Sequence, residues 1–265
     1  MPDVRLIESR SHILAVEGDR VTGTIGVIAQ PGRVGLVFPL ALDRPTSEVP
    51  GRLISAALDR LRRAGAAFAQ LVAPLEQAEV AEPFIDSGFT VLTDALMLQL
   101  SLPPETSAAN RDCLDAIACG PENDRTPLLE LIRRVNVGSL DCPELDALRS
   151  CEDLLDAHAG HAQDGRARWW RFEHQGKDVG LLLACVAEDA AAWEILFFGV
   201  VPEQRGQGYG RKMLEQFQSI AAREITAIRA GLDSRNAFAA RVYEDAGYAE
   251  LGRLRVWIHP LRPSE

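Results

Sequence analysis

The chain has 265 residues, of which 47% are hydrophobic and 25% are charged, and its formal net charge is −10. This length accommodates two domains of ordinary size. The negative charge disfavours binding to a nucleic-acid backbone, which relies on clustered Lys and Arg, and favours a cationic or neutral small substrate. No apolar run approaches the ~20 residues that a membrane-spanning helix needs, so no membrane partner is predicted.

The N-terminal segment and the cysteines bear on the cellular compartment. The segment after Met1 alternates polar and apolar residues and has no apolar stretch typical of a secretion signal. The five cysteines are odd in number and show no C-x-x-C spacing, which argues against a disulfide framework and a zinc site. We therefore expect a reducing cytoplasm and no metal.

The first half contains a helical pattern, a strand and a linker. Apolar residues at helical spacing between Leu53 and Leu61 predict an amphipathic helix, and residues 69–72 form the next strand. Residues 101–107 are rich in Pro and Ser without periodicity, which is typical of a linker. The sequence therefore predicts a domain boundary near 104–110.

The second half begins with helical segments at Thr126–Pro127 and after Pro143. Residues 193–201 are almost continuously apolar, as in a strand buried on both faces, and Pro202 ends this run. An amphipathic helix is predicted from Gly210 onward. Its apolar positions are Met213, Leu214, Phe217, Ile220 and Ala221.

A strand at 226–232, a short helix from Asn236 to Ala246 and a final strand at 254–258 complete the second half. Gly247 is placed to close the short helix. Residues 159 positions apart match in the two halves: Gly210 with Gly51, Phe197 with Phe38, and Gly247-Tyr248 with Gly88-Phe89. This ungapped correspondence predicts an internal duplication.

The segment Arg205-Gly206-Gln207-Gly208-Tyr209-Gly210 lies between the buried strand and the helix. Free N–H groups and the positive end of the helix dipole make such a loop a site for a pyrophosphate, and Arg205 or Arg211 can add charge-assisted contacts. A P-loop, a dinucleotide fold and a CoA loop share this feature. The P-loop spacing is absent; Asp233 suits a dinucleotide fold, but too few residues follow it for a second nucleotide-binding half.

The loop and the segments around it resemble the GNAT superfamily of acyl-CoA-dependent N-acyltransferases. Arg205, Gly208 and Gly210 fill its R/Q-x-x-G-x-G/A motif, and Val200-Val201-Pro202-Glu203 precede the motif as in the family. The downstream N-x-x-A-x-x-x-Y-x-x-x-G-[FY] phrase runs from Asn236 through Tyr243 to Gly247-Tyr248. The resemblance covers about residues 165–258.

This resemblance implies an acetyl-CoA site and a mechanism. The cofactor-binding residues would be Phe198, Gly199, Val200, Arg205, Gly206, Gln207, Gly208, Tyr209, Gly210, Arg211 and Asn236, with the N–H of Phe198 polarising the acyl carbonyl. Tyr243 takes the place of the general acid that protonates the CoA thiolate. Glu194 stands at the spacing of the general base in the histone-acetyltransferase branch; packing alone is the competing interpretation of both residues.

At the ungapped offset the first half loses these features. Gly35 replaces Glu194, Pro39 replaces Phe198, Thr46 replaces Arg205, Val49 replaces Gly208 and Phe84 replaces Tyr243. Pro39 has no N–H to donate and Phe84 has no proton to give. Tandem members of the superfamily such as mycothiol synthase show a similar division, with one half catalytic.

Three other features invite a functional interpretation that we set aside. His158 and His161 lack a third metal ligand, Trp169 and Trp170 fit ordinary packing better than an acceptor pocket, and the acidic residues between 141 and 156 fit a solvated helix face.

The predicted fold is α+β, with two tandem GNAT-like domains that each hold a mixed, mostly antiparallel sheet flanked by helices. Residues 1–104 form a degenerate, truncated domain without catalysis, and residues 110–265 form the catalytic domain. The expected function is transfer of an acetyl group from acetyl-CoA to a primary amine of a small molecule or peptide. The alternative is a non-catalytic acyl-CoA-binding or regulatory module.

Overall fold

The computed structural model describes residues 4–43, 48–102, 114–163, 165–187 and 191–261. Most of the predicted linker at 101–107 lies outside them. The chain divides into two compact units: unit 1 comprises Met1–Asp94, Glu144–Arg149 and Arg253–Glu265, and unit 2 comprises Ala95–Pro143 and Ser150–Gly252. Within the described ranges, no helix is long and apolar enough to cross a membrane.

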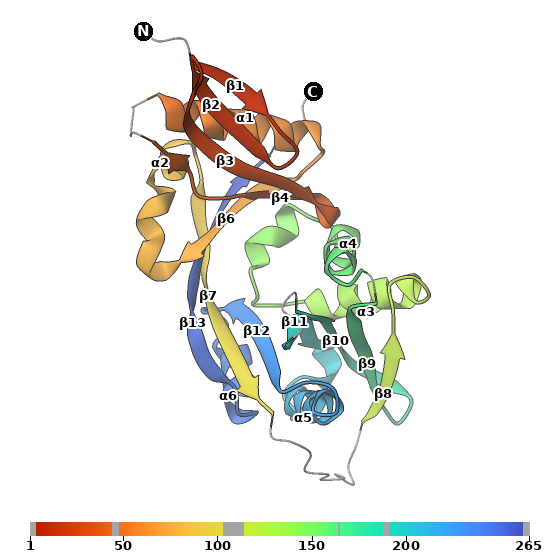
Figure 1. The fold of residues 1–265 in the computed structure, drawn as a ribbon. Coiled ribbons are helices and arrows are strands. Elements are labelled where there is room, and N and C mark those ends of the chain that lie inside the picture. Colours follow the sequence, from red (N-terminus) through yellow and green to blue (C-terminus); the bar gives the residue numbers. More distant parts are fainter. Residues whose placement is uncertain (1–3, 44–47, 103–113, 164, 188–190, 262–265) are drawn as a thin grey trace. The chain divides into compact units, whose positions relative to one another are not determined.

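The first half of the chain forms a hairpin, further strands and two α-helices (Figure 1). Its elements are β1 (Val4–Glu8), β2 (His12–Glu17), β3 (Arg20–Gln30), η1 (Pro31–Arg33), β4 (Val34–Val37), β5 (Ala41–Leu42), α1 (Val49–Arg63), β6 (Phe68–Pro74), η2 (Leu75–Ala81), α2 (Glu82–Asp86) and β7 (Thr90–Ser101).

The second half adds two helices before its hairpin, as the sequence predicts. Its elements are β8 (Asp115–Cys119), α3 (Arg125–Asn136), η3 (Pro143–Ala147), α4 (Cys151–His161), β9 (Ala167–His174), β10 (Lys177–Val186), β11 (Trp193–Val200), η4 (Pro202–Gln204), α5 (Tyr209–Ala221), β12 (Ala227–Asp233), α6 (Ala237–Asp245) and β13 (Ala249–Pro260).

The last strand of each half lies in the sheet formed by the other half. In unit 2, residues 95–101 of β7 pair antiparallel with β12; in unit 1, residues 254–260 of β13 pair antiparallel with β6 (Figure 1). The strand order is β1-β2-β3-β4-β6-β13 in unit 1 and β7-β12-β11-β10-β9-β8 in unit 2. The strand expected at 254–258 is thus present but completes unit 1, so the compact units are not the two halves of the sequence.

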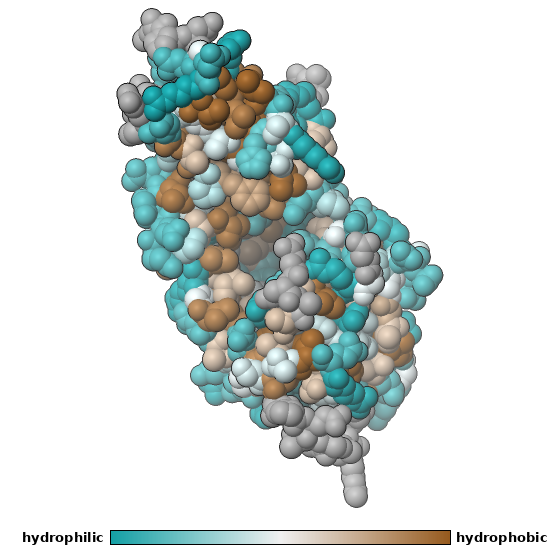
Figure 2. Space-filling view, in the orientation of Figure 1, coloured by the Kyte–Doolittle hydropathy of each residue, from teal (hydrophilic) through white to brown (hydrophobic). Residues whose placement is uncertain are grey.

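Each unit has its own hydrophobic core. In unit 1, α1 packs its buried stripe on the sheet, and Trp257 of β13 belongs to the same core. In unit 2 the sheet is covered on both faces: one face packs on α5 and α6, and the other packs on α3 and α4. The surface in view mixes hydrophilic and hydrophobic residues (Figure 2).

The correspondence between the halves is not the ungapped one. In unit 2, Ile228 pairs with Trp193; in unit 1, Ala69, the counterpart of Ile228, pairs with Gly35. Gly35 therefore corresponds to Trp193 and not to Glu194. The ungapped alignment is therefore wrong by one residue from Gly35 to Val37.

A second shift of one residue, in the opposite direction, occurs at α1. The buried pairs that begin the core-facing stripes are residues 53–54 in α1 and 213–214 in α5. The helices also begin one residue after Glu48 and Gly208, which are their N-caps. Glu48 rather than Val49 is therefore the counterpart of Gly208. The Gly51–Gly210 match in the sequence is coincidental.

Candidate functional site

β11 contains a bulge that opens a gap beside it. The antiparallel pairing with β10 skips Leu196, and the parallel pairing with β12 covers only Trp193 to Ile195. A bulge reverses which residues face each side of a sheet. Trp193 and Ile195 accordingly pack toward α5, as does Phe198 beyond the bulge, while Phe197 packs toward α3 and α4. Beyond Ile195, β11 has no pairing with β12 among the described residues.

The backbone beyond the bulge directs two N–H groups toward this gap. The N–H of Val201 bonds to the carbonyl oxygen of Val179 at 2.9 Å, on the β10 side. Because hydrogen-bonding groups alternate between the two edges of a strand, the N–H groups of Val200 and Phe198 point to the opposite edge, and that of Gly199 points to β10. The strand therefore offers two donors to a ligand in the gap.

Gly199 has a packing role. A Cβ added there would lie 2.2 Å from Cγ1 of Val135, and one added at Gly180 of the neighbouring strand β10 would lie 2.3 Å from the Gly199 carbonyl oxygen. Both contacts are far shorter than van der Waals separation. α3 can thus approach β11 because position 199 lacks a side chain.

The loop before α5 holds its backbone open. Gly206 and Gly208 have φ of +73° and +78°, and a Cβ at either position would meet nothing within 4 Å. α5 begins directly after Gly208, so the first N–H groups of the helix lack intrahelical partners and attract an anion. A Cβ on Gly210 would lie 3.7 Å from the Phe198 ring and 3.8 Å from a methyl group of Val200, so the first turn of α5 packs beside these residues of β11.

The side chains of the loop differ in what they contact. The Arg205 guanidinium donates to the carbonyl oxygens of Val200, Val137 and Val135 at 3.0, 2.8 and 2.7 Å. Arg211 pairs with Glu215 at 2.7 Å on the exposed side of α5. Arg205 is therefore bound to protein carbonyls, and the phosphate contact expected of it stays a prediction.

Two further side chains of the loop have local contacts. Gln207 donates to the carbonyl oxygen of Glu203 at 3.2 Å. The Tyr209 ring lies between His174 and Lys212, at 5.6 Å from the imidazole centroid and 5.8 Å from Nζ. The loop thus has basic groups beside its open backbone.

Tyr243 is buried beside β11. Its ring packs edge-on against Phe198 at 5.8 Å and against Tyr248 at 5.0 Å. Burial raises the pKa of the Tyr243 phenol well above its usual value, and Tyr248 and the negative charge of Asp141 raise this pKa further. Tyr243 therefore stays protonated at neutral pH, in contact with the residue whose N–H faces the gap.

Glu194 lies before the bulge, where β11 is still paired with β12. Its side chain is 45% exposed, and Oε1 is 3.9 Å from a guanidinium nitrogen of Arg229. Alternation along the strand places it on the face opposite Trp193 and Ile195, which is the α3 side. Glu194 and Tyr243 are thus on opposite faces of the sheet.

Asn236 is the N-cap of α6: its Oδ1 accepts a hydrogen bond from the N–H of Ala239 at 3.1 Å. This contact satisfies a free donor of the helix. The expected cofactor-binding role of Asn236 stays a prediction, and the oxygen of its side chain already has a structural partner.

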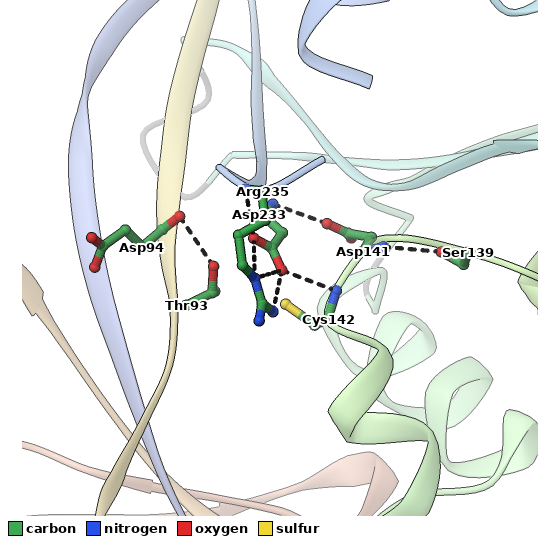
Figure 3. Close-up of polar contacts among 7 residues, drawn as sticks. All are labelled: Thr93, Asp94, Ser139, Asp141, Cys142, Asp233 and Arg235. Atoms are coloured by element: carbon green, nitrogen blue, oxygen red, sulfur yellow. Dashed lines mark hydrogen bonds and ion pairs between the residues drawn. The ribbon is translucent and has the colours of Figure 1, made fainter. Parts of the chain in front are cut away.

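The sequence did not reveal a polar cluster at the end of β12 (Figure 3). Asp233 is 2% exposed and binds Arg235 with both carboxylate oxygens, and its N–H donates to Oδ1 of Asp141 at 2.9 Å. The N–H of Cys142 donates to Asp233 at 3.3 Å, and burial raises the pKa of the Cys142 thiol to about 12. No local pattern signals contacts between residues so distant in sequence.

Unit 1 has a poor anion site at the corresponding place. The N-cap Glu48 has helical φ and ψ of −102° and −29° where Gly208 is left-handed, and it brings a carboxylate to the N-terminus of α1. Pro50 has no N–H, so the first turn of α1 lacks one donor. Thr46 lies outside the described residues.

The remaining catalytic positions of unit 1 are also apolar. With the corrected pairing, Leu36 stands in place of Glu194. Pro39 keeps the place of Phe198, because Leu196 at the β11 bulge has no counterpart in β4, where Phe38 follows Val37 directly in the pairing with β3. Pro39 therefore has no N–H to donate at the place where Phe198 has one. Phe84 is fully buried and packs edge-on against Phe89 at 5.3 Å, as Tyr243 packs against Tyr248.

The features set aside in the sequence have ordinary contacts. Trp169 is 1% exposed, and Trp170 stacks on Trp193 at 5.8 Å. His158 lies 5.9 Å from the Phe197 ring. In the part of the chain that the structure describes, no group of three or more His, Cys, Asp or Glu residues is arranged to hold a metal ion.

Comparison with known proteins found a family model that matches this region of the chain. Residues 165–250 match the family model of the acetyltransferase (GNAT) domain. A search of curated proteins gave no match. A GCN5-related N-acetyltransferase from Sphaerobacter thermophilus aligns with 97% of this chain and 82% of its own, with a TM-score of 0.66 and 16% identity.

Two further solved structures are similar. A tandem GNAT protein from the clavulanic acid biosynthesis pathway aligns with 96% of this chain and 83% of its own, with a TM-score of 0.56 and 14% identity. A GNAT-family acetyltransferase from Colwellia psychrerythraea aligns with 98% of this chain and 100% of its own, with a TM-score of 0.54 and 15% identity. These likenesses confirm the predicted fold, α+β with a tandem GNAT-like arrangement.

Proposed function

We propose that this chain, in which residues 165–250 form a GNAT acetyltransferase domain, transfers an acetyl group from acetyl-CoA to a primary amine of a small molecule or peptide. The observation that carries the proposal is the gap beside β11: N–H groups of Phe198 and Val200 face it, next to the free N-terminus of α5. The amine nitrogen attacks the acyl carbon, the C–S bond breaks, and an amide and CoA result.

The two backbone regions have separate roles. The N–H groups of the loop and the first turn of α5 would bind the pyrophosphate, with Arg211 supplying positive charge. The N–H of Phe198 would donate to the acyl oxygen, whose negative charge grows in the transition state. One such donor contributes about 3–4 kcal/mol in related acyl transfers.

Tyr243 is the proposed general acid. Its raised pKa keeps the phenol protonated, which is the form that can donate to the leaving thiolate. Contact with Phe198 supports this role, because the thioester sulfur must lie near the donor that binds the acyl oxygen.

Glu194 is the proposed proton acceptor for the amine. Its half-exposed carboxylate stands one residue before the gap opens, on the α3 side. Since it lies on the sheet face opposite Tyr243, a proton would reach it through water rather than by direct contact.

The first half of the chain, residues 1–104, is proposed to be non-catalytic, with catalysis in residues 110–265. Glu48, Pro50 and Phe84 support this division, because they remove the anion site and the acid from unit 1. A non-catalytic acyl-CoA-binding module is the alternative, in which Glu194 and Tyr243 serve packing alone.

A screen of primary amines with acetyl-CoA tests the proposal, with Tyr243→Phe as the matched variant. We expect CoA release with at least one amine class and a large loss of turnover in Tyr243→Phe at unchanged CoA affinity. CoA binding without turnover of any amine would favour the binding module; absence of CoA binding would contradict both.

A further inference from the structure

Arg205 fills the first fixed position of the loop motif, yet its guanidinium points away from the open face of the loop. All three of its hydrogen bonds go to main-chain carbonyls: one at the end of β11 (Val200) and two at the end of α3 (Val135 and Val137). The last carbonyls of a helix have no intrahelical partner and carry the negative end of the helix dipole. Arg205 therefore caps α3 from a distance in sequence.

The segment after this cap, residues 137–142, is fixed at its other end too. Asp141 accepts from the N–H of Asp233, and the N–H of Cys142 donates to the Asp233 carboxylate (Figure 3). Asp233 is the last residue of β12, the strand that borders the gap. We call residues 137–142 the α3 turn.

The α3 turn lies near the proposed chemistry and presents side chains to solvent. The charge of Asp141 acts on the buried Tyr243 phenol. Val137 is 62% exposed and Leu140 is 50% exposed. The turn thus presents two apolar side chains to solvent at the end of β12.

We propose that Arg205 is a positioning residue that couples the acyl-CoA loop to the α3 turn. The inference rests on the proposed function. When the loop is fixed by a pyrophosphate, Arg205 is fixed with it, and the end of α3 gains order before the acceptor arrives. Its role is therefore not that of a phosphate ligand.

The planar guanidinium of arginine can donate to several carbonyls at once, which a lysine ammonium cannot do with the same geometry. Both side chains carry the positive charge that would bind a phosphate. Arg205→Lys thus separates the positioning of the α3 turn from the binding of a phosphate, because it keeps the charge and loses the carbonyl contacts. Arg205→Gln removes the charge as well. Arg241→Gln is the control, because Arg241 is an exposed residue of α6 that pairs with Asp245.

Hydrogen exchange of the amides in residues 137–142 and calorimetric titration with CoA provide the two measurements. In both Arg205 variants, we expect exchange in the α3 turn to rise about tenfold or more, the factor that loss of one charge-assisted hydrogen bond corresponds to. CoA should slow this exchange in the unchanged protein and not in Arg205→Lys. CoA affinity should change less than about threefold in Arg205→Lys, and Arg241→Gln should leave exchange in the turn unchanged.

Unchanged exchange in the turn, or CoA affinity that falls in Arg205→Gln and returns in Arg205→Lys, would overturn the proposal. If the unchanged protein fails to bind CoA, the proposed function fails; exchange without ligand then still decides whether Arg205 holds the turn. If Arg205→Gln does not fold, Arg205→Lys and the CoA-dependent exchange of the unchanged protein decide the question.

Discussion

Replacing Gly199 with alanine should destabilise unit 2 through one identified contact. The new Cβ would lie 2.2 Å from Cγ1 of Val135, whereas carbon atoms attract best at about 3.5–4.0 Å. Val135 is β-branched and sits in a helix, so its side chain is held in one rotamer and cannot turn away. Overpacking of this kind costs about 1–3 kcal/mol.

Val135→Ala should relieve the clash. The next atom that the new Cβ would meet is Cβ of Val135 at 3.7 Å, an ordinary contact that the substitution leaves in place. Alone, Val135→Ala removes two methyl groups from the core and should cost about 1.6 kcal/mol at ~0.8 kcal/mol each. The double variant should then be about as stable as Val135→Ala, which gives a favourable coupling free energy of about 1–3 kcal/mol.

Urea unfolding of the four proteins in this cycle measures the coupling from the midpoints and slopes. In Gly199→Ala the clash should also displace β11 and lower the rate of acetyl transfer, because the N–H of the neighbouring Phe198 would then be misplaced. Additive effects of the two substitutions would refute the reasoning, since they would mean that α3 and β11 do not meet through Gly199 and Val135.

The other predictions concern the site and the exchanged strand. Gly208→Val places a β-branched residue at φ +78°, a conformation that such residues avoid. Calorimetry should then detect no CoA binding, while circular dichroism shows a folded protein. Unchanged CoA affinity would refute the loop assignment. Tyr243→Phe should lower kcat about 10²-fold or more at unchanged CoA affinity, and equal kcat would exclude a general acid at this position. Glu194→Gln should lower kcat/KM for the amine, and an unchanged kcat/KM would assign the base elsewhere. A hydrogen bond from Arg255 is the main cause of the lowered pKa of Asp94. Asp94 therefore stabilises the fold above the unfolded-state pKa near 4, and this contribution is lost as pH falls below it. Arg255→Met should make the free energy of unfolding depend less on pH between about pH 5 and 2, and an unchanged acid-unfolding curve would show that the pair contributes nothing.

Local patterns in the sequence were sufficient for the elements that hold the site. The apolar run of β11, the helical stripe of α5 and the glycines between them predicted a strand, a helix and an open loop, because each depends on neighbouring residues. Long-range pairing was not predictable. β7 and β13 have similar alternation, so nothing local indicates which sheet each strand completes.

The same limit explains the errors in the site. Glycines at positions 51 and 210 suggested an ungapped correspondence, but core-facing periodicity shows that the match is coincidental. The carbonyl partners of Arg205 on α3 could not be predicted either, because they lie 68 and 70 residues earlier in the chain. Contacts of this kind follow from tertiary packing alone.

Calorimetric titration of the whole chain with acetyl-CoA tests the central claim most directly, with Gly208→Val alongside. One site per chain that is lost in Gly208→Val is the predicted result, because unit 2 has open glycines before α5 while unit 1 has Glu48 and Pro50 at the start of α1. Two sites per chain would contradict the assignment of a non-catalytic first half, and no binding would contradict the proposed acetyl transfer.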